Sequence, residues 1–101
     1  MGYYESVDQT GVINTPSVQT GASALAKNLE RKGWMIQNQG TNVLRVCLGG
    51  TASSTVYHVV LKGCTSAADG TGGSISQTNG IVYTGAITVD GTSMSYTVME
   101  M

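Results

Sequence analysis

From Gly33 to the end of the chain, apolar residues alternate with polar ones in short runs, which is the pattern of half-buried β-strands. In the run around Arg45, for example, Leu44, Val46 and Leu48 share one face of an extended chain. Val, Ile, Thr and Tyr, which favour strands, are frequent in these runs. The alternation predicts five strands, over residues 34–38, 43–48, 55–62, 81–89 and 94–99.

Polar and glycine-rich segments separate these strands. Residues 39–42 and the pair Gly49-Gly50 predict turns, and Asp90-Gly91 predicts the tight turn of a hairpin. Residues 63–78 are long, polar and rich in glycine, so we expect a loop there. Unstructured loops of this length are usually functional or disordered.

The first 24 residues show neither strand nor helix periodicity over any sustained run. We expect an extended N-terminal arm, with one short strand near residues 11–14, that is either mobile or laid on a neighbouring subunit. Tyrosine combines a large contact area with a polar tip, which suits an anchor. The candidate partner-binding residues of the arm are Tyr3, Tyr4, Val12 and Ile13.

Residues 22–31 are the one segment with a helix-forming composition. Ala22, Leu25, Ala26 and Leu29 recur at the spacing of one helix face, and Gly33 would end the helix soon afterwards. The segment is short, so a bridging strand or an irregular link is an open alternative.

Five strands, with one more from the arm, predict an all-β fold: a small antiparallel β-sandwich or barrel of about 5–7 strands. The long helices that parallel strands need between them are missing from the pattern. We therefore divide the chain into an arm, 1–24, and a β-sandwich domain, 25–101. Trp34 stands beside Ile36 at the start of a strand, which favours a place in the core.

Composition narrows the classes of function. Only 11% of the 101 residues are charged and the net charge is −1, so nothing indicates a nucleic-acid partner. No apolar run is long enough to span a membrane, and the start of the chain does not match a signal peptide. We expect synthesis in a cytoplasm, where Cys47 and Cys64 would be reduced thiols. A surface so poor in charge suits a protein that neighbours cover, although an ordinary Ser/Thr-rich surface explains the composition equally well.

The residues that chemistry would need are sparse. His58 is the only histidine, and neither cysteine stands in a nucleophile motif. The segment Asp69-Gly70-Thr71-Gly72-Gly73 lacks the further carboxylates of a calcium loop and the lysine of a phosphate loop. We expect no enzyme activity, no cofactor and no metal site, and a flexible loop tip at Asp69.

One long motif opens the body of the chain: Asn28-Leu29-Glu30-Arg31-Lys32-Gly33-Trp34-Met35-Ile36-Gln37-Asn38-Gln39-Gly40-Thr41-Asn42, followed by Leu44-Arg45-Val46 and Leu48-Gly49. Further segments follow at 69–73, at 80–85 and in the last strand, which closes on Glu100. Through these segments the body, residues 28–101, resembles a recurrent type of small virion protein of tailed bacteriophages. These motifs are structural and not catalytic.

The resemblance implies a capsid decoration (cement) protein, located on the virion surface after synthesis in the host cytoplasm. Its partners would be the major capsid protein and further copies of itself, with a trimer favoured. Arg31 would pair with Glu30, with Glu100 or with a neighbouring subunit, and it joins the candidate partner-binding residues. Two alternatives stay open: another phage structural component (head fibre, tail or adaptor module), and a carbohydrate-binding or adhesin module using Tyr57, Tyr83 or Tyr96 beside the 63–78 loop.

Overall fold

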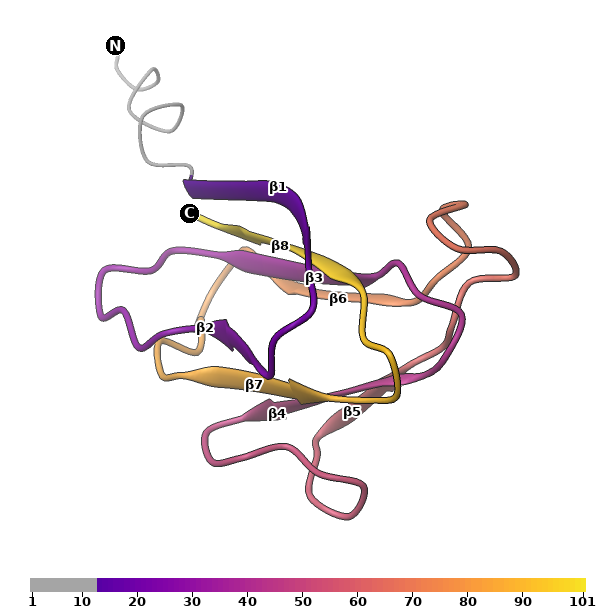
Figure 1. Cartoon of the computed structure of the whole chain (residues 1–101). Helices are drawn as coiled ribbons and strands as arrows, with labels where there is room; N and C mark the ends of the chain where they lie inside the picture. The colour runs from indigo at the N-terminus through magenta and orange to yellow at the C-terminus, as the bar shows by residue number, and fades with distance from the viewer. Residues whose placement is uncertain (1–12) are drawn as a thin grey trace, which may run out of the picture.

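The computed structural model describes residues 13–101, with side chains from Val18 onward. Two antiparallel four-stranded sheets lie face to face (Figure 1). One sheet, sheet A, has the order β1-β8-β3-β6, and the other, sheet B, has the order β2-β7-β4-β5. The strands are β1 (Ile13–Gln19), β2 (Ser23–Leu25), β3 (Trp34–Asn38), β4 (Leu44–Leu48), β5 (Val59–Leu61), β6 (Ser74–Gln77), β7 (Ile87–Asp90) and β8 (Tyr96–Glu100). The predicted small all-β sandwich is confirmed.

The core lies between the sheets and is built by the alternation read from the sequence. In β3 the buried positions are Trp34, Ile36 and Asn38, while Met35 and Gln37 are half-buried on the outer face. Sheet A contributes Tyr96 and Val98 from β8 as well. Sheet B faces them with a set of aliphatic side chains: Leu44, Val46, Leu61, Ile87 and Val89.

The N-terminal region differs from the expectation. Strand β1 starts at Ile13 and pairs with β8, and most of β2 also lies before residue 25. Residues 13–24, which we had assigned to the arm, thus supply strands to both sheets. The only proline, Pro16, lies in β1 at the edge of sheet A, where the register with β8 shifts; an edge strand tolerates the missing N–H donor.

Residues 22–31 do not form the helix that their apolar spacing allowed. Instead β2 pairs with β7, and Ala24 and Leu25 pack against the core. The open alternative of a bridging strand followed by an irregular link is what the structure has. Ten residues of modest helix propensity gain little alone, so tertiary packing decides their conformation.

Two further predictions were wrong in detail. The Asp90-Gly91 turn does not close a hairpin, because β7 belongs to sheet B while β8 belongs to sheet A. The 63–78 segment is not all loop, because its last residues form β6, which pairs with β3. Strand β6 has one apolar residue, Ile75, and its weak alternation explains why the sequence pattern missed it.

Candidate functional site

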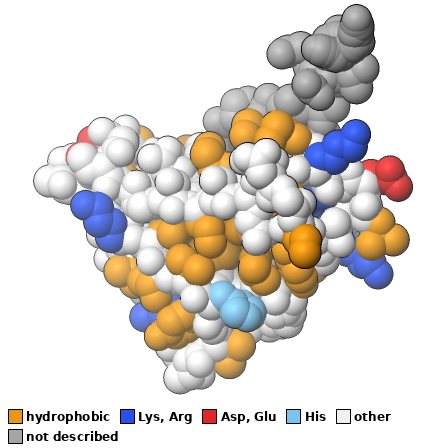
Figure 2. Space-filling model, turned by 180° about the vertical axis from the view of Figure 1, so that it is seen from behind, with side chains coloured by type: hydrophobic (Ala, Val, Ile, Leu, Met, Phe, Trp, Pro, Cys, Tyr) orange, Lys and Arg blue, Asp and Glu red, His pale blue; other side chains and the backbone are white. Residues whose placement is uncertain are grey.

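Exposed apolar side chains gather on the outer side of sheet B, around its edge strand β5. Strand β5 pairs with β4 only, so it ends the sheet. We call this patch the β5 surface. Its centre is Arg45, Tyr57 and Val60, joined by a ring contact and by the strand ladder. We include the exposed Val43, two residues before Arg45, and the exposed Val56, next to Tyr57 in the chain. Figure 2, which views the sandwich from its side, shows hydrophobic side chains close to the only histidine of the chain, His58. Exposed apolar residues that cluster in this way are typical of contact surfaces.

The strand pattern itself places these side chains outward. Leu44 and Val46 point into the core, so Val43 and Arg45 between and beside them point away from it. Val60 on β5 lies opposite Arg45 in the ladder and is 46% exposed. Alternation puts Val60 on the face opposite to the buried Leu61, but nothing in the sequence indicates that this face stays uncovered.

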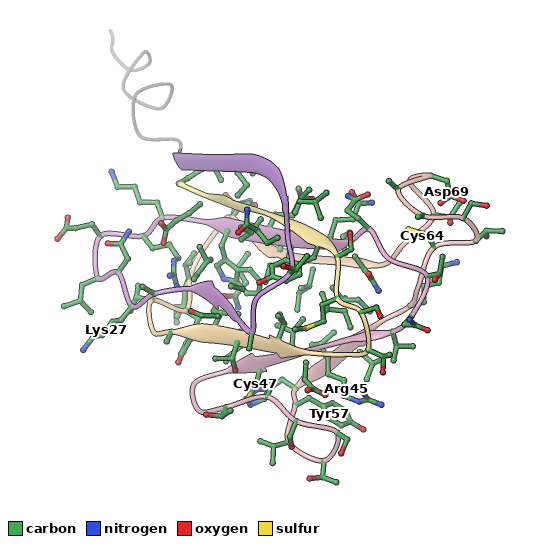
Figure 3. All side chains as sticks on the ribbon, in the orientation of Figure 1. Lys27, Arg45, Cys47, Tyr57, Cys64 and Asp69 are labelled. Atoms are coloured by element: carbon green, nitrogen blue, oxygen red, sulfur yellow. The ribbon has the colours of Figure 1, made fainter. Side chains whose placement is uncertain are left out.

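Tyr57 and Arg45 form the centre of the surface. The guanidinium carbon of Arg45 lies 5.8 Å from the ring centroid of Tyr57, within the range of a cation–π contact. Figure 3 shows both side chains below β4. Arg45 also pairs with Asp90 at 3.7 Å, a weak surface ion pair that nonetheless restrains the guanidinium. Tyrosine and arginine, held in position and surrounded by aliphatic groups, are the residue types that dominate binding energy at protein interfaces.

The segment between β4 and β5 folds back over sheet B and buries Cys47. Ala52 is buried there, and its N–H donates to the hydroxyl of Thr88 on β7 (2.9 Å). The same Thr88 hydroxyl donates to the carbonyl of Gly50 (3.1 Å). The thiol of Cys47 donates to the carbonyl of Gly49 (3.1 Å). Cys47 and Cys64 are both free and buried.

His58 has a structural place at the start of β5. Its N–H donates to the carbonyl of Val46 (2.7 Å), and its Nδ1 accepts a hydrogen bond from the N–H of Leu48 (3.0 Å). A ring that accepts at Nδ1 carries its proton on Nε2. The imidazole therefore extends the β4–β5 pairing beyond the strand and fixes the base of the segment that carries Tyr57.

The Asp69 tip is more ordered than the flexible loop we expected. The carboxylate accepts hydrogen bonds from the N–H of Ser66 (2.8 Å) and from the N–H and hydroxyl of Thr71 (2.9 and 2.5 Å). These donors, with the Thr71 hydroxyl first, lower the pKa of Asp69 from 3.8 to about 2. The carboxylate thus organises the loop. Within residues 13–101, no three or more His, Cys, Asp or Glu side chains are grouped where they could hold a metal ion.

Arg31, predicted as a partner contact, lies in the interior. Its side chain has no exposed surface, and its Nε donates to a carboxylate oxygen of Glu100 at 2.7 Å. The remaining donors reach three carbonyl oxygens, those of Ala26, Tyr83 and Gly85, at 2.7–2.9 Å. Of the alternatives left open for Arg31, the pair with Glu100 is the one present, and burial leaves this side chain no surface to offer a partner.

The other predicted contact residues fall at or before the start of the described chain. Tyr3, Tyr4 and Val12 lie outside the described residues. Ile13 opens β1, and its Cα is opposite that of Glu100. Among the tyrosines considered for sugar binding, Tyr96 is fully buried and Tyr83 half-buried, whereas Tyr57 is 45% exposed. Figure 3 places Tyr57 and the Asp69 loop in different regions of the molecule, so Tyr57 is not beside that loop.

No helix in the described part of the chain is long and apolar enough to cross a membrane. Comparison of the chain with protein families, with curated proteins and with solved structures gives no match.

Proposed function

We propose that this chain is a structural virion protein, a capsid decoration protein that binds the major capsid shell and stabilises it through the β5 surface. The observation that carries the proposal is the cluster of exposed Tyr57 and Val60 with half-buried Arg45 at the edge strand β5. The resemblance of residues 28–101 to small virion proteins of tailed phages supplies the class of partner.

The chemistry of the cluster fits a protein partner better than a small molecule. Burying the exposed part of three valines and a tyrosine against a shell releases about 25 cal/mol for each Å² of apolar area. Arg45 and the Tyr57 hydroxyl supply the polar contacts that fix orientation. A cement protein acts by bridging neighbouring shell subunits. It therefore needs a binding surface and no catalytic residues. Self-association as a trimer belongs to the same proposal.

A second candidate, carbohydrate binding, rests on the exposure of Tyr57 alone. A sugar site needs several hydrogen-bonding side chains around the aromatic ring, and Arg45 is the one polar side chain that the structure places against the ring of Tyr57 within the described residues. A glycan-binding assay with the Tyr57→Ala variant as control separates this candidate from the first.

The experiment uses capsids assembled from the major capsid protein encoded with this chain, stripped of decoration. Tyr57→Ala and Val60→Ser should each weaken binding about tenfold or more, as expected for the centre of an interface. The matched control is Ile81→Ser, which alters an aliphatic side chain that is 96% exposed and outside the β5 surface; its affinity should stay at the wild-type value.

Three outcomes would contradict parts of the proposal separately. Failure of the wild-type chain to bind any shell overturns the decoration role. If Ile81→Ser reduces the affinity for the shell as much as Tyr57→Ala does, the β5 surface is not the contact with the shell. Electron cryomicroscopy of the particle distinguishes density spread over the shell from density at the tail vertex, which would indicate the tail or adaptor alternative.

A further inference from the structure

The loop after β6 carries an asparagine followed by glycine, Asn79-Gly80, and this is the only such step in the sequence. Both residues are exposed. Gly80 has φ +72°, a left-handed conformation that glycine adopts without strain. Within the described chain, the Asn79 side chain makes no hydrogen bond, and the N–H of Gly80 donates none to other loop or turn backbone.

We propose that Asn79 is a site of spontaneous, base-promoted deamidation. The backbone nitrogen of Gly80 loses its proton and attacks Cγ of the Asn79 side chain. A new N–Cγ bond closes a five-membered succinimide, the bond from Cγ to the amide nitrogen breaks, and ammonia leaves with the proton. Water then adds to either ring carbonyl, and opening of the ring leaves aspartate or isoaspartate. No electrons are exchanged, and water is the only co-reactant.

The structure favours the reaction at this position for three reasons. Gly80 has no side chain to hinder the approach of its nitrogen. The Asn79 amide is not held in a network, so it is free to rotate toward the backbone. The loop is exposed on both sides of the step, so water and hydroxide reach it. Asparagine is among the residues whose chemical lability limits protein lifetime.

The three other asparagines whose side chains the structure describes serve as internal controls. Asn38 is buried and its amide nitrogen donates to the carbonyls of Asn42, Leu61 and Lys62. Asn42 donates to the carbonyl of Thr92 and is followed by the β-branched Val43. Asn28 accepts from the N–H of Glu30 and is followed by Leu29. Each lacks at least two of the features that Asn79-Gly80 combines.

Deamidation would change the surface of this loop. A chain with net charge −1 would gain one negative charge and reach −2. The new carboxylate, at position 79, would lie two positions before Ile81 in the chain. Ile81 is the most exposed large apolar residue described. Isoaspartate would also lengthen the backbone by one carbon, close to the segment in which the N–H of Tyr83 donates to the Gln77 side chain.

The test incubates the folded, full-length chain in water enriched in heavy oxygen, in a mildly acidic and a mildly alkaline buffer, followed by peptide mapping with mass spectrometry. The Asn79 peptide should lose its amide nitrogen, incorporate one heavy oxygen and split into two isomers. Its conversion should be at least several-fold faster in alkali, and at least several-fold faster than that of any peptide carrying Asn28, Asn38 or Asn42.

Two variants separate this mechanism from general decay. Asn79→Gln keeps an amide but needs a larger ring, so conversion should almost stop. Gly80→Ala adds a methyl group that hinders attack, so conversion should slow several-fold, and circular dichroism of the variant reports whether the fold is kept. An Asn79 peptide that converts no faster than the other three, or that converts equally fast in Gly80→Ala, overturns the proposal.

Discussion

A guanidinium is stable inside a protein only when its charge is paired and its N–H groups find acceptors, and Arg31 meets both conditions. Glu100 supplies the opposite charge, and three backbone carbonyls take the remaining hydrogen bonds. These acceptors come from the link after β2, from the segment before β7 and from the end of β8. Arg31 therefore joins three parts of the chain that are far apart in the sequence.

Removal of this side chain should be strongly destabilising. Arg31→Met leaves Glu100 and three carbonyls without their donor, and we expect the free energy of unfolding to fall by about 3–5 kcal/mol. Urea denaturation measures the change. The matched control is Arg45→Met, whose ion pair with Asp90 is longer and exposed, and whose loss should cost at most about 1 kcal/mol. Equal losses in the two variants would show that the Arg31 network is not stabilising.

Asp69 gives a pH-dependent prediction at the same scale. Its folded pKa of about 2 lies below the ordinary value of 3.8, so the hydrogen-bonded carboxylate favours the folded loop above about pH 4. This contribution is lost as the pH falls from 3.8 toward 2. NMR titration of the carboxyl group should show the low pKa in the wild-type chain.

The Thr71 hydroxyl is the first cause of the shift, so Thr71→Val should raise the pKa of Asp69 part of the way back to 3.8. The N–H groups of Ser66 and Thr71 still donate to the carboxylate in this variant, so the pKa of Asp69 should stay below 3.8. Thr51→Val, a change at an exposed threonine elsewhere, is the control and should leave the titration as it is. A wild-type pKa near 3.8 would contradict the described loop.

At the scale of the element, β1 is one of the strands that the sequence pattern did not reveal, together with β2 and β6. Strand β1 pairs with β8 along the edge opposite to β3, from Ile13 opposite Glu100 to Gln19 opposite Tyr96. The hydroxyl of Tyr96 also donates to the carbonyl of Gly21 just after this strand (2.6 Å). The strand thus belongs to the folded unit, and an experiment on the arm must stop before residue 13.

Two truncations test this placement. Deletion of residues 1–20 removes β1 and exposes the edge of β8, so the free energy of unfolding should fall by at least about 2 kcal/mol, given the several ladder hydrogen bonds lost. Deletion of residues 1–12 retains β1 and should cost less. Chemical denaturation compares the two chains. If both truncated chains are equally stable, β1 does not stabilise the sandwich.

Elements also show where reading the sequence succeeds. Strands β3 and β4 follow from alternation: every second residue of β3 is buried, and Leu44 and Val46 of β4 are buried on one face of their strand. The predicted 81–89 strand was only half right: Gly85 lies against the Tyr83 hydroxyl, where an added Cβ would overlap the ring, and the extended pairing begins at Ile87. The predicted 55–62 strand shrinks to Val59–Leu61, because Val56 and Tyr57 lie in the exposed segment before it.

For the whole molecule, the fold class and the core were predictable, while the contact surface was not. Alternation shows which face of a strand is apolar, and Trp34 accordingly lies fully buried. It does not show which outer face stays uncovered, and Val60 and Tyr57 are exposed because no other element of the described chain covers the outer side of the sheet at these positions. The interior place of Arg31 was equally hidden, since its acceptors are backbone carbonyls that sequence does not distinguish.

The position of β8 sets the order in which the chain can fold. Sheet A is held together by β8, which lies between β1 and β3, yet β8 is the last strand in the sequence. During synthesis, β1 has no pairing partner until β8 has left the ribosome. Contacts between such distant segments make folding slow. Until β8 is made, β1 and β3 each lack a neighbour in sheet A, and loss of β8 would remove the centre of that sheet and not merely one edge.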